Sequence, residues 1–223
     1  MNKQKVLKQT KEFWAKFYSK KEITKTEPSS FALWSMDRYI KKSDNIFEIG
    51  CGNGRDSFAF IENGNSIFAI DGCKIAISDN NQYLKKLSKN NQATFKSIDF
   101  NDLYDLEYDF LDKIDIFYSR FVLHAIPEEL EDMLLTYMYQ KLPKNGKIIH
   151  EFRTNHDQLM NYGEELSENE RVTDHYRRFI DTKKFRNKLS KLGFKELYFI
   201  ESNGLAIFGK DNPVVARVVG IKR

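Results

Sequence analysis

The sequence predicts an α/β protein built on an open β-sheet that is parallel except near its end. From residue 45 onward, short apolar segments alternate with segments of helical periodicity, which is the pattern of repeated β-α units. At residues 45–61 an apolar segment leads into three glycines at alternate positions and then into a helical segment. A hairpin signal at Asn203-Gly204 indicates that antiparallel pairing enters only late in the chain.

Two helices are predicted before the sheet begins. Apolar residues near helical spacing predict an amphipathic helix over residues 3–20. A serine at position 29 or 30 can cap a second helix over residues 31–41. Together these segments predict a helical cap over residues 1–43, which is expected to cover the glycine turn.

The remaining elements follow from apolar periodicity and from turn residues. Strands are expected at residues 45–49, 66–70, 93–98, 114–118 and 147–152, and helices at residues 55–62, 74–87, 128–141 and 182–192. A hairpin is expected from residues 194–201 and 205–208, with a short last strand at residues 214–219. Residues 153–181 are polar and irregular, and a connection of this length predicts a substrate-side insertion.

Length and composition are those of one globular domain spanning residues 1–223. The net charge of +4 is dispersed along the chain, whereas nucleic-acid-binding proteins usually carry a concentrated basic stripe, so no nucleic-acid partner is expected. Cys51 and Cys73 form no disulfide framework, which favours reduced thiols and a cytoplasmic location. The sequence has no signal-peptide pattern and no apolar run long enough to span a membrane.

The glycine turn predicts a ligand site. Gly50, Gly52 and Gly54 allow the positive φ angles of a tight turn and a close approach to the backbone, and the first amides of the following helix face the turn. A phosphate-binding loop would need Lys-Ser or Lys-Thr after the glycines. A dinucleotide fingerprint would need its third glycine where Arg55 stands. A nucleotide-like ligand of another kind is therefore expected.

Acidic residues follow the next two predicted strands. Asp71 comes about twenty residues after the glycine turn, where a carboxylate can accept both hydroxyls of a ribose; an alternative role is a helix N-cap. Asp99 follows the third strand and is placed to accept an adenine amino group, with Phe100 against the ring; alternatively it is an ordinary loop residue. Ligands of open α/β sheets bind at these carboxyl ends of strands.

The pattern Glu-x-Gly-x-Gly-x-Gly from Glu48 to Gly54 resembles motif I of the class I S-adenosylmethionine (SAM) methyltransferases. That resemblance implies a Rossmann-like sheet of seven strands with the last antiparallel, helices on both faces, and SAM as the cofactor. It also implies the following cofactor-binding residues: Glu48, Gly50, Cys51, Gly52, Asn53, Gly54, Asp71, Gly72, Asp99, Phe100 and Ser119. No metal site is expected.

Segments 28–32, 118–126, 151–154 and 175–179 resemble, more narrowly, a bacterial subgroup linked to capsule and surface-polysaccharide modification. Members of that subgroup include enzymes associated with O-methyl phosphoramidate decoration. The residues after the fourth strand, Ser119-Arg120-Phe121, differ from the Asn/Asp-Pro-Pro-aromatic motif of amide methylases. Neither cysteine is placed there to serve a cysteine-dependent base methylase.

The acceptor decides which side chains the reaction needs. A sugar hydroxyl needs a positioned base, for which His124 and His175 are candidates. An anionic oxygen needs cationic orientation instead, for which Arg120 is the catalytic candidate. The candidate substrate-binding residues are Tyr18, Phe31, Arg153, Tyr176, Arg177 and Arg178. Core packing remains the alternative role for the aromatic residues and for His124, and ion pairing with nearby carboxylates for some of the arginines.

These features predict a SAM-dependent O-methyltransferase acting on a small anionic precursor of a capsular or surface polysaccharide, for example a phosphoramidate. Methylation of a sugar hydroxyl or another small metabolite is the first alternative. A non-catalytic SAM-binding protein is the second, and a nucleic-acid methylase is disfavoured by the dispersed charge. The sequence does not indicate the oligomeric state.

Overall fold

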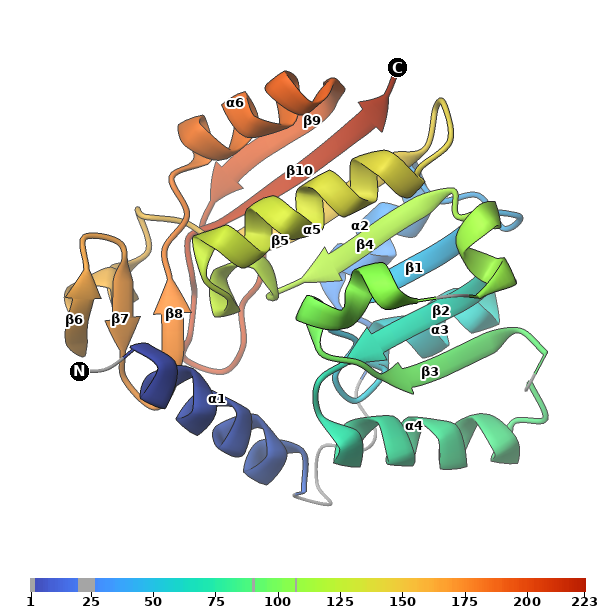
Figure 1. Cartoon of the computed structure of the whole chain (residues 1–223), viewed down its shortest axis with the longest axis horizontal. Coiled ribbons are helices and arrows are strands. Elements are labelled where there is room, and N and C mark those ends of the chain that lie inside the picture. The colour runs from blue at the N-terminus through green and yellow to red at the C-terminus, as the bar shows by residue number, and fades with distance from the viewer. Residues whose placement is uncertain (1–2, 20–26, 90, 107) are drawn as a thin grey trace.

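Seven strands form one mixed sheet in the computed structural model, which describes residues 3–19, 27–89, 91–106 and 108–223 (Figure 1). The strands are β1 (Asn45–Ile49), β2 (Ser66–Asp71), β3 (Ala93–Ser97), β4 (Ile116–Arg120), β5 (Lys147–Arg153), β9 (Phe194–Ser202) and β10 (Val215–Lys222). Their order is β3-β2-β1-β4-β5-β10-β9. Strands β1 to β5 pair in parallel, and β10 is antiparallel to both of its neighbours. The predicted fold class, with its last strand antiparallel, is confirmed.

Helices cover both faces of the sheet. They are α1 (Lys3–Tyr18), α2 (Ser30–Arg38), α3 (Arg55–Asn63), α4 (Lys74–Lys86), α5 (Glu128–Lys141) and α6 (Thr182–Leu192), with short 3-10 turns η2 (Phe100–Asp105), η3 (Asp109–Lys113), η4 (Leu123–Ala125) and η5 (Gln158–Asn161). The residues of α5, α6 and η2 pack on one face, and those of α2, α3 and α4 on the other. Residue 20 of the predicted first helix lies outside the described ranges.

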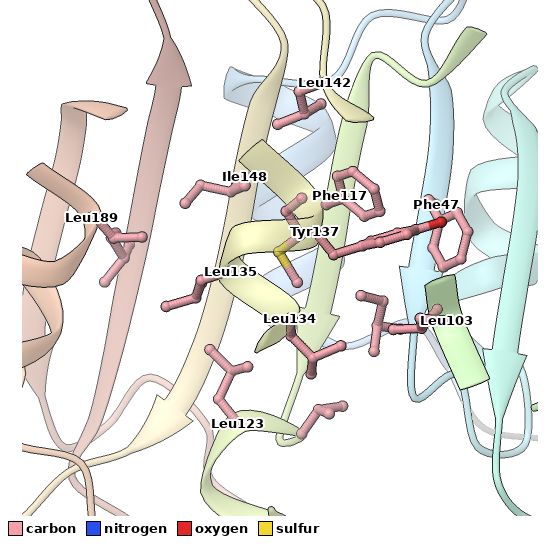
Figure 2. Packing of buried hydrophobic residues seen from close by; sticks show 14 of the residues in the cluster. Phe47, Leu103, Phe117, Leu123, Leu134, Leu135, Tyr137, Leu142, Ile148 and Leu189 are labelled. Carbon is pink, nitrogen blue, oxygen red and sulfur yellow. The ribbon is translucent and has the colours of Figure 1, made fainter. Parts of the chain in front are cut away.

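Alternation along each strand divides the core into two layers, because successive side chains of a strand point to opposite faces. Phe47 of β1 and Phe117 of β4 face α5, whereas their neighbours Ile46 and Ile116 face the layer of α2 to α4. All four side chains are fully buried. Figure 2 shows Leu134, Leu135 and Tyr137 of α5 lying over Phe117 and Ile148.

The insertion at residues 153–181, which was predicted to be irregular, contains regular secondary structure. It contains a second sheet of three short strands, β6 (Glu164–Ser167), β7 (Glu170–Val172) and β8 (Tyr176–Arg178). Helix α1 packs against β8, where the Tyr176 backbone N–H donates to Thr10 Oγ1 at 3.0 Å. The insertion and the amino-terminal helix therefore form one wall beside the carboxyl ends of the main strands (Figure 1).

The predicted carboxyl-terminal hairpin was wrong in its second strand. Strand β9 pairs with β10, and residues 205–208 belong to the connection between them. The apolar segment predicted as a short last strand is the eight-residue β10, which lies inside the sheet between β5 and β9. A buried interior strand accounts for its apolar sequence better than a hairpin edge does.

None of the helices within the described ranges is long and apolar enough to cross a lipid bilayer. The carboxyl ends of the parallel strands β1 to β5 meet at one edge of the sheet. In open α/β sheets this edge is where ligands bind.

Candidate active site

The glycine turn after β1 has the predicted backbone. Gly50, Gly52 and Gly54 have φ angles of 71°, 51° and 73°. A side chain at Gly50 would collide with Val122, and one at Gly52 would collide with the Tyr18 hydroxyl. Other groups can therefore approach the backbone closely at these two glycines only because they have no Cβ atom.

Three groups hold this turn in place. The backbone N–H groups of Gly50 and Cys51 donate to the Ile70 carbonyl at 2.8 and 3.0 Å. Asp71 Oδ2 accepts the Gly52 N–H at 2.9 Å. Asn80 of α4 donates to the Gly52 carbonyl at 2.9 Å. These hydrogen bonds fix the backbone of the turn, which also contains Asn53.

Asp71 links the turn after β1 to the turn after β2. Its second oxygen, Oδ1, accepts the Cys73 N–H at 2.7 Å, and Gly72 between them is exposed. Burial raises the pKa of the Asp71 carboxyl, and the two backbone N–H donors oppose that rise. Asp71 can hold these turns and also bind a ligand, because each carboxylate oxygen can accept more than one hydrogen bond.

Asp99 lies after β3 and is paired with Lys11 of α1. It also caps η2 through the Asn101 N–H at 3.1 Å, and Phe100 beside it is partly buried. Burial raises the pKa of Asp99, but Lys11 and Asn101 outweigh it, so the pKa lies below its ordinary value. The Lys11 ammonium thus pairs with the Asp99 carboxylate, which was predicted to bind adenine.

This arrangement predicts the effect of Lys11→Met. If Asp99 accepts the adenine amino group, removing the competing ammonium should tighten SAM binding by a few-fold. The pair is largely exposed, so a small effect on stability is expected. Calorimetric titration of SAM into both proteins measures the effect. Lys5→Met on the same helix is the control, and weaker SAM binding by Lys11→Met would contradict the adenine assignment of Asp99.

Three more of the predicted cofactor residues have side chains that bond inside the protein. Glu48 is 4% exposed and accepts a hydrogen bond from Ser57 of α3. Burial and the nearby Asp56 raise the pKa of Glu48 to about 8. Ser119 is fully buried, and its hydroxyl lies 2.8 Å from His150 Nδ1. The buried Cys51 thiol of the turn also packs inward, near Asn80. The Ser119 side chain thus belongs to the core between β4 and β5.

His124 is poorly placed to act as a base. It is buried in η4, and its Nδ1 accepts the Arg153 backbone N–H at 3.2 Å. The proton of the neutral ring must then sit on Nε2, so that nitrogen can donate but cannot accept. Burial and the Arg153 charge hold the pKa of His124 well below its usual range.

His175 is also buried, in the wall formed by α1 and the insertion. Its ring stacks on Phe13 with centroids 4.4 Å apart and lies 4.8 Å from the Trp14 ring. Burial and the Arg177 charge lower the pKa of His175 to about 4, although Asp174 opposes them. A histidine of this pKa is uncharged at neutral pH and is a weak base.

All four predicted arginines are bound to carboxylates. Arg153 pairs with Asp157 at 3.0 Å and with Asp211. Arg177 pairs with Asp174 at 2.7 Å. Arg178 was predicted to contact the substrate. It is instead only 6% exposed, and it binds Glu131 and the carbonyls of Leu123 and Ile126.

Arg120 differs from the other three because it shares its carboxylate with a second arginine. It ends β4, and its Nε donates to Glu151 at 2.9 Å. Glu151 is fully buried and also accepts from Arg217 Nε at 2.8 Å. Two guanidinium groups therefore share one carboxylate, and the side chain of Arg120 remains 20% exposed.

The predicted aromatic residues divide between core and site. Phe31 is fully buried and stacks on Tyr118, and Tyr176 is fully buried with its hydroxyl donating to Glu170 at 2.6 Å. Both positions contradict the predicted contact with a substrate, because neither side chain reaches the surface. Tyr18 of α1 lies against Gly52, and burial and Asp71 raise the pKa of its hydroxyl.

Sequence reasoning missed three polar residues that support the site. Asn80 holds the glycine turn, Asp56 accepts from Ser29 and Tyr118 beneath it, and Arg217 binds Glu151. Two of them have a signal in the sequence. Asn80 lies on the apolar face of its helix, and Arg217 interrupts an apolar strand. A polar group in such a place is buried and needs a partner.

The residues at this edge fit a SAM molecule. The glycine turn is a cradle that a Cβ atom would fill, and carboxylates follow β2 and β3 at Asp71 and Asp99. Within the described ranges, no group of three or more His, Cys, Asp or Glu side chains is placed to hold a metal ion.

Comparisons with known proteins agree with this fit. Residues 9–157 match the family model of thiopurine S-methyltransferase (TPMT). Comparison with curated proteins gave no match. Among solved structures, a SAM-dependent methyltransferase from Methanosarcina mazei is similar with a TM-score of 0.69 and 18% identity, over 83% of this chain and 95% of that one.

Two further structures have the same fold. TehB from Haemophilus influenzae has a TM-score of 0.68 and 14% identity, over 91% of this chain and 65% of that one. The glycopeptide N-methyltransferase MtfA, in complex with S-adenosylhomocysteine, has a TM-score of 0.67 and 14% identity, over 89% and 91% of the two chains. At these identities the likeness concerns the fold. The family model covers more than half of the chain, which therefore belongs to the thiopurine S-methyltransferase family and is a SAM-dependent methyltransferase.

Proposed function

We propose that this methyltransferase acts on a small acceptor that is already ionised when it binds. The leading case is an anionic oxygen of a capsular or surface-polysaccharide precursor, for example a phosphoramidate, which makes the enzyme an O-methyltransferase. Such an acceptor needs orientation and charge stabilisation, but it has no proton to lose.

The observation that carries this proposal is the charge on the Arg120–Glu151–Arg217 cluster. Two guanidinium groups share one buried carboxylate, so the cluster retains one positive charge. Arg120 follows Ser119, which pairs with Ile49 of β1, so Arg120 and the glycine turn lie at the carboxyl ends of adjacent strands. The excess charge is therefore next to the turn that would hold the cofactor.

The two candidate histidines support the same proposal, because neither is placed to act as a strong base. His124 has its Nδ1 occupied, and His175 is a weak base with a pKa of about 4. A sugar hydroxyl would need a stronger base than either one to lose its proton. An acceptor that brings its own negative charge avoids this requirement.

The roles of the residues follow from this geometry. Bound SAM supplies a methyl group on a positively charged sulfur, and transfer requires an in-line approach of the acceptor. The glycine turn and Asp71 would hold the nucleoside portion. Arg120 would orient the anion, and the wall of α1 and the insertion, with Phe13 and Trp14, would exclude water.

A thiol acceptor is a second candidate, because the matching family model is named for thiopurine S-methylation. A thiol, with an ordinary pKa of about 8.5, ionises far more readily than a sugar hydroxyl and also needs no strong base. The aromatic rings of Phe13, Trp14 and Phe121 near the histidines offer flat surfaces on which a heterocycle could stack.

One assay separates these acceptors. Production of demethylated cofactor would be measured with phosphorylated and phosphoramidated sugars, their neutral counterparts, and heterocyclic thiols, from pH 6 to 9. We expect turnover of the phosphorylated or phosphoramidated acceptors with a flat pH profile. We also expect Arg120→Met to raise their KM by about tenfold or more, because a charge-assisted hydrogen bond is lost.

The control is Arg186→Met, which removes an exposed arginine that pairs with Glu196 on α6 and β9. Turnover of neutral hydroxyls that rises with pH would contradict the proposal and return the role of base to a histidine. Turnover confined to thiols would select the second candidate. SAM binding without turnover of any acceptor would support a non-catalytic protein.

A further inference from the structure

Glu151 joins three neighbouring strands through one row of side chains. It stands opposite Arg120 of β4 and opposite Arg217 of β10 in the strand register. Each of its oxygens accepts from a different arginine, Oε1 from Arg120 and Oε2 from Arg217, at 2.9 and 2.8 Å. The carboxylate is fully buried, and within the described ranges the charges that offset its burial are those of Arg120 and Arg217.

The two arginines are held very differently. Arg217 is 6% exposed, and its Nη2 also donates to Ser30 Oγ at 3.1 Å and to the Leu205 carbonyl at 2.8 Å. Its guanidinium lies over the rings of Phe31 and Trp34, 5.3 and 5.4 Å from their centroids. The Arg217 side chain is therefore held both by hydrogen bonds and by contacts with aromatic rings.

Arg120 is fixed at one point. Its Nε binds Glu151, and its guanidinium lies over the Phe121 ring at 4.3 Å. Among the described residues, Nε is the atom of Arg120 that pairs with a carboxylate. The orientation of Arg120 thus depends on where Arg217 holds Glu151.

We propose that Arg217 is a positioning residue of the methyltransferase, acting through Glu151 to orient Arg120 toward a phosphate-type acceptor. This inference rests on the proposed function of Arg120. By occupying one oxygen of Glu151, Arg217 prevents Arg120 from closing onto both oxygens. It also supplies the second positive charge that keeps the cluster cationic.

Removing Arg217 should change both properties. In Arg217→Met, Arg120 is expected to bind both oxygens of Glu151, and the pair becomes neutral. In Arg217→Lys the charge remains, but an ammonium lacks the fork needed to bind Glu151, Ser30 and Leu205 together. We therefore expect a graded loss of anion binding, larger for methionine than for lysine.

The test uses phenyl phosphate as the probe, titrated calorimetrically into the full chain saturated with S-adenosylhomocysteine. We expect Arg217→Met to weaken phenyl phosphate binding by about fivefold or more, and Arg217→Lys by a smaller factor. Binding of S-adenosylhomocysteine should change by less than twofold. Arg186→Met is the matched control for losing an arginine-glutamate pair elsewhere.

A spectroscopic readout separates positioning from a general structural role. The Nε–H resonance of Arg120 in ¹⁵N-labelled protein should shift in both Arg217 variants and remain unchanged in Arg186→Met. An unshifted resonance, or unchanged phenyl phosphate binding in Arg217→Lys, would overturn the inference. If Arg120→Met weakens binding but the Arg217 variants do not, the proposed function stands and this inference fails. If the wild-type protein does not bind phenyl phosphate, both fail.

Discussion

Asp71→Ala is expected to weaken SAM binding by at least about tenfold, because the carboxylate is predicted to accept hydrogen bonds from the ribose and each such charged bond is worth about 1.5–3 kcal/mol. The same change removes the acceptor of the Gly52 and Cys73 N–H groups. The glycine turn should therefore loosen as well. Calorimetric titration of SAM, with thermal unfolding of the free protein, measures the two effects separately.

Two variants help to interpret this result. Asp71→Asn keeps one acceptor oxygen and should lose less SAM affinity than Asp71→Ala. Asp79→Ala removes an exposed carboxylate from the neighbouring helix α4 and should bind SAM normally. Unchanged SAM affinity in Asp71→Ala would show that the cofactor site has been assigned to the wrong residues.

Glu48→Gln is expected to make the folded protein less sensitive to alkaline pH. Burial and the nearby Asp56 raise the pKa of Glu48 from 4.5 to about 8. A rise of that size contributes at most roughly 5 kcal/mol to the free energy of unfolding. Glutamine carries no titrating proton, so this contribution disappears in the variant.

The direction follows from proton binding. Between pH 4.5 and about 8 the folded protein keeps a proton on Glu48 that the unfolded chain releases. Wild-type stability from this group is therefore complete below pH 4.5 and is lost progressively as the pH rises toward 8. The difference in unfolding free energy between Glu48→Gln and wild type should grow over the same interval.

Denaturant unfolding at several pH values between 5 and 9 measures this difference. Glu62→Gln, at an exposed position on α3, is the control and should follow the wild type. A constant difference between Glu48→Gln and wild type would mean that Glu48 ionises normally. The SAM affinity of Glu48→Gln also tests whether Glu48 contributes to the cofactor site, as the sequence motif implies.

The main sheet could be predicted because its elements are signalled locally. Apolar strands, glycine turns and capped helices each require only a few adjacent residues, and β1 and α5 lie at their predicted positions. The strands of the small sheet could not be found in this way. Glu164–Ser167 and Tyr176–Arg178 are short and polar, so they show no apolar alternation.

The glycine turn was predictable for the same local reason, but the partners of the arginines were not. Arg120 meets a carboxylate 31 positions away, and Arg153 meets one 58 positions away. Such pairs depend on which strands become neighbours in the sheet. The sequence offered local ion pairing as an alternative, which the Arg177–Asp174 pair confirms, but it did not reveal the distant carboxylates that bind Arg120 and Arg153.

The place of β10 inside the sheet has a consequence for biosynthesis. A ribosome delivers β5 and β9 before it delivers the strand that separates them. Until Val215–Lys222 has emerged, β5 has an open edge and Glu151 lacks its partner from that strand. The nascent chain can complete the cofactor turn early, but the Arg120–Glu151–Arg217 cluster can form only after β10 has emerged.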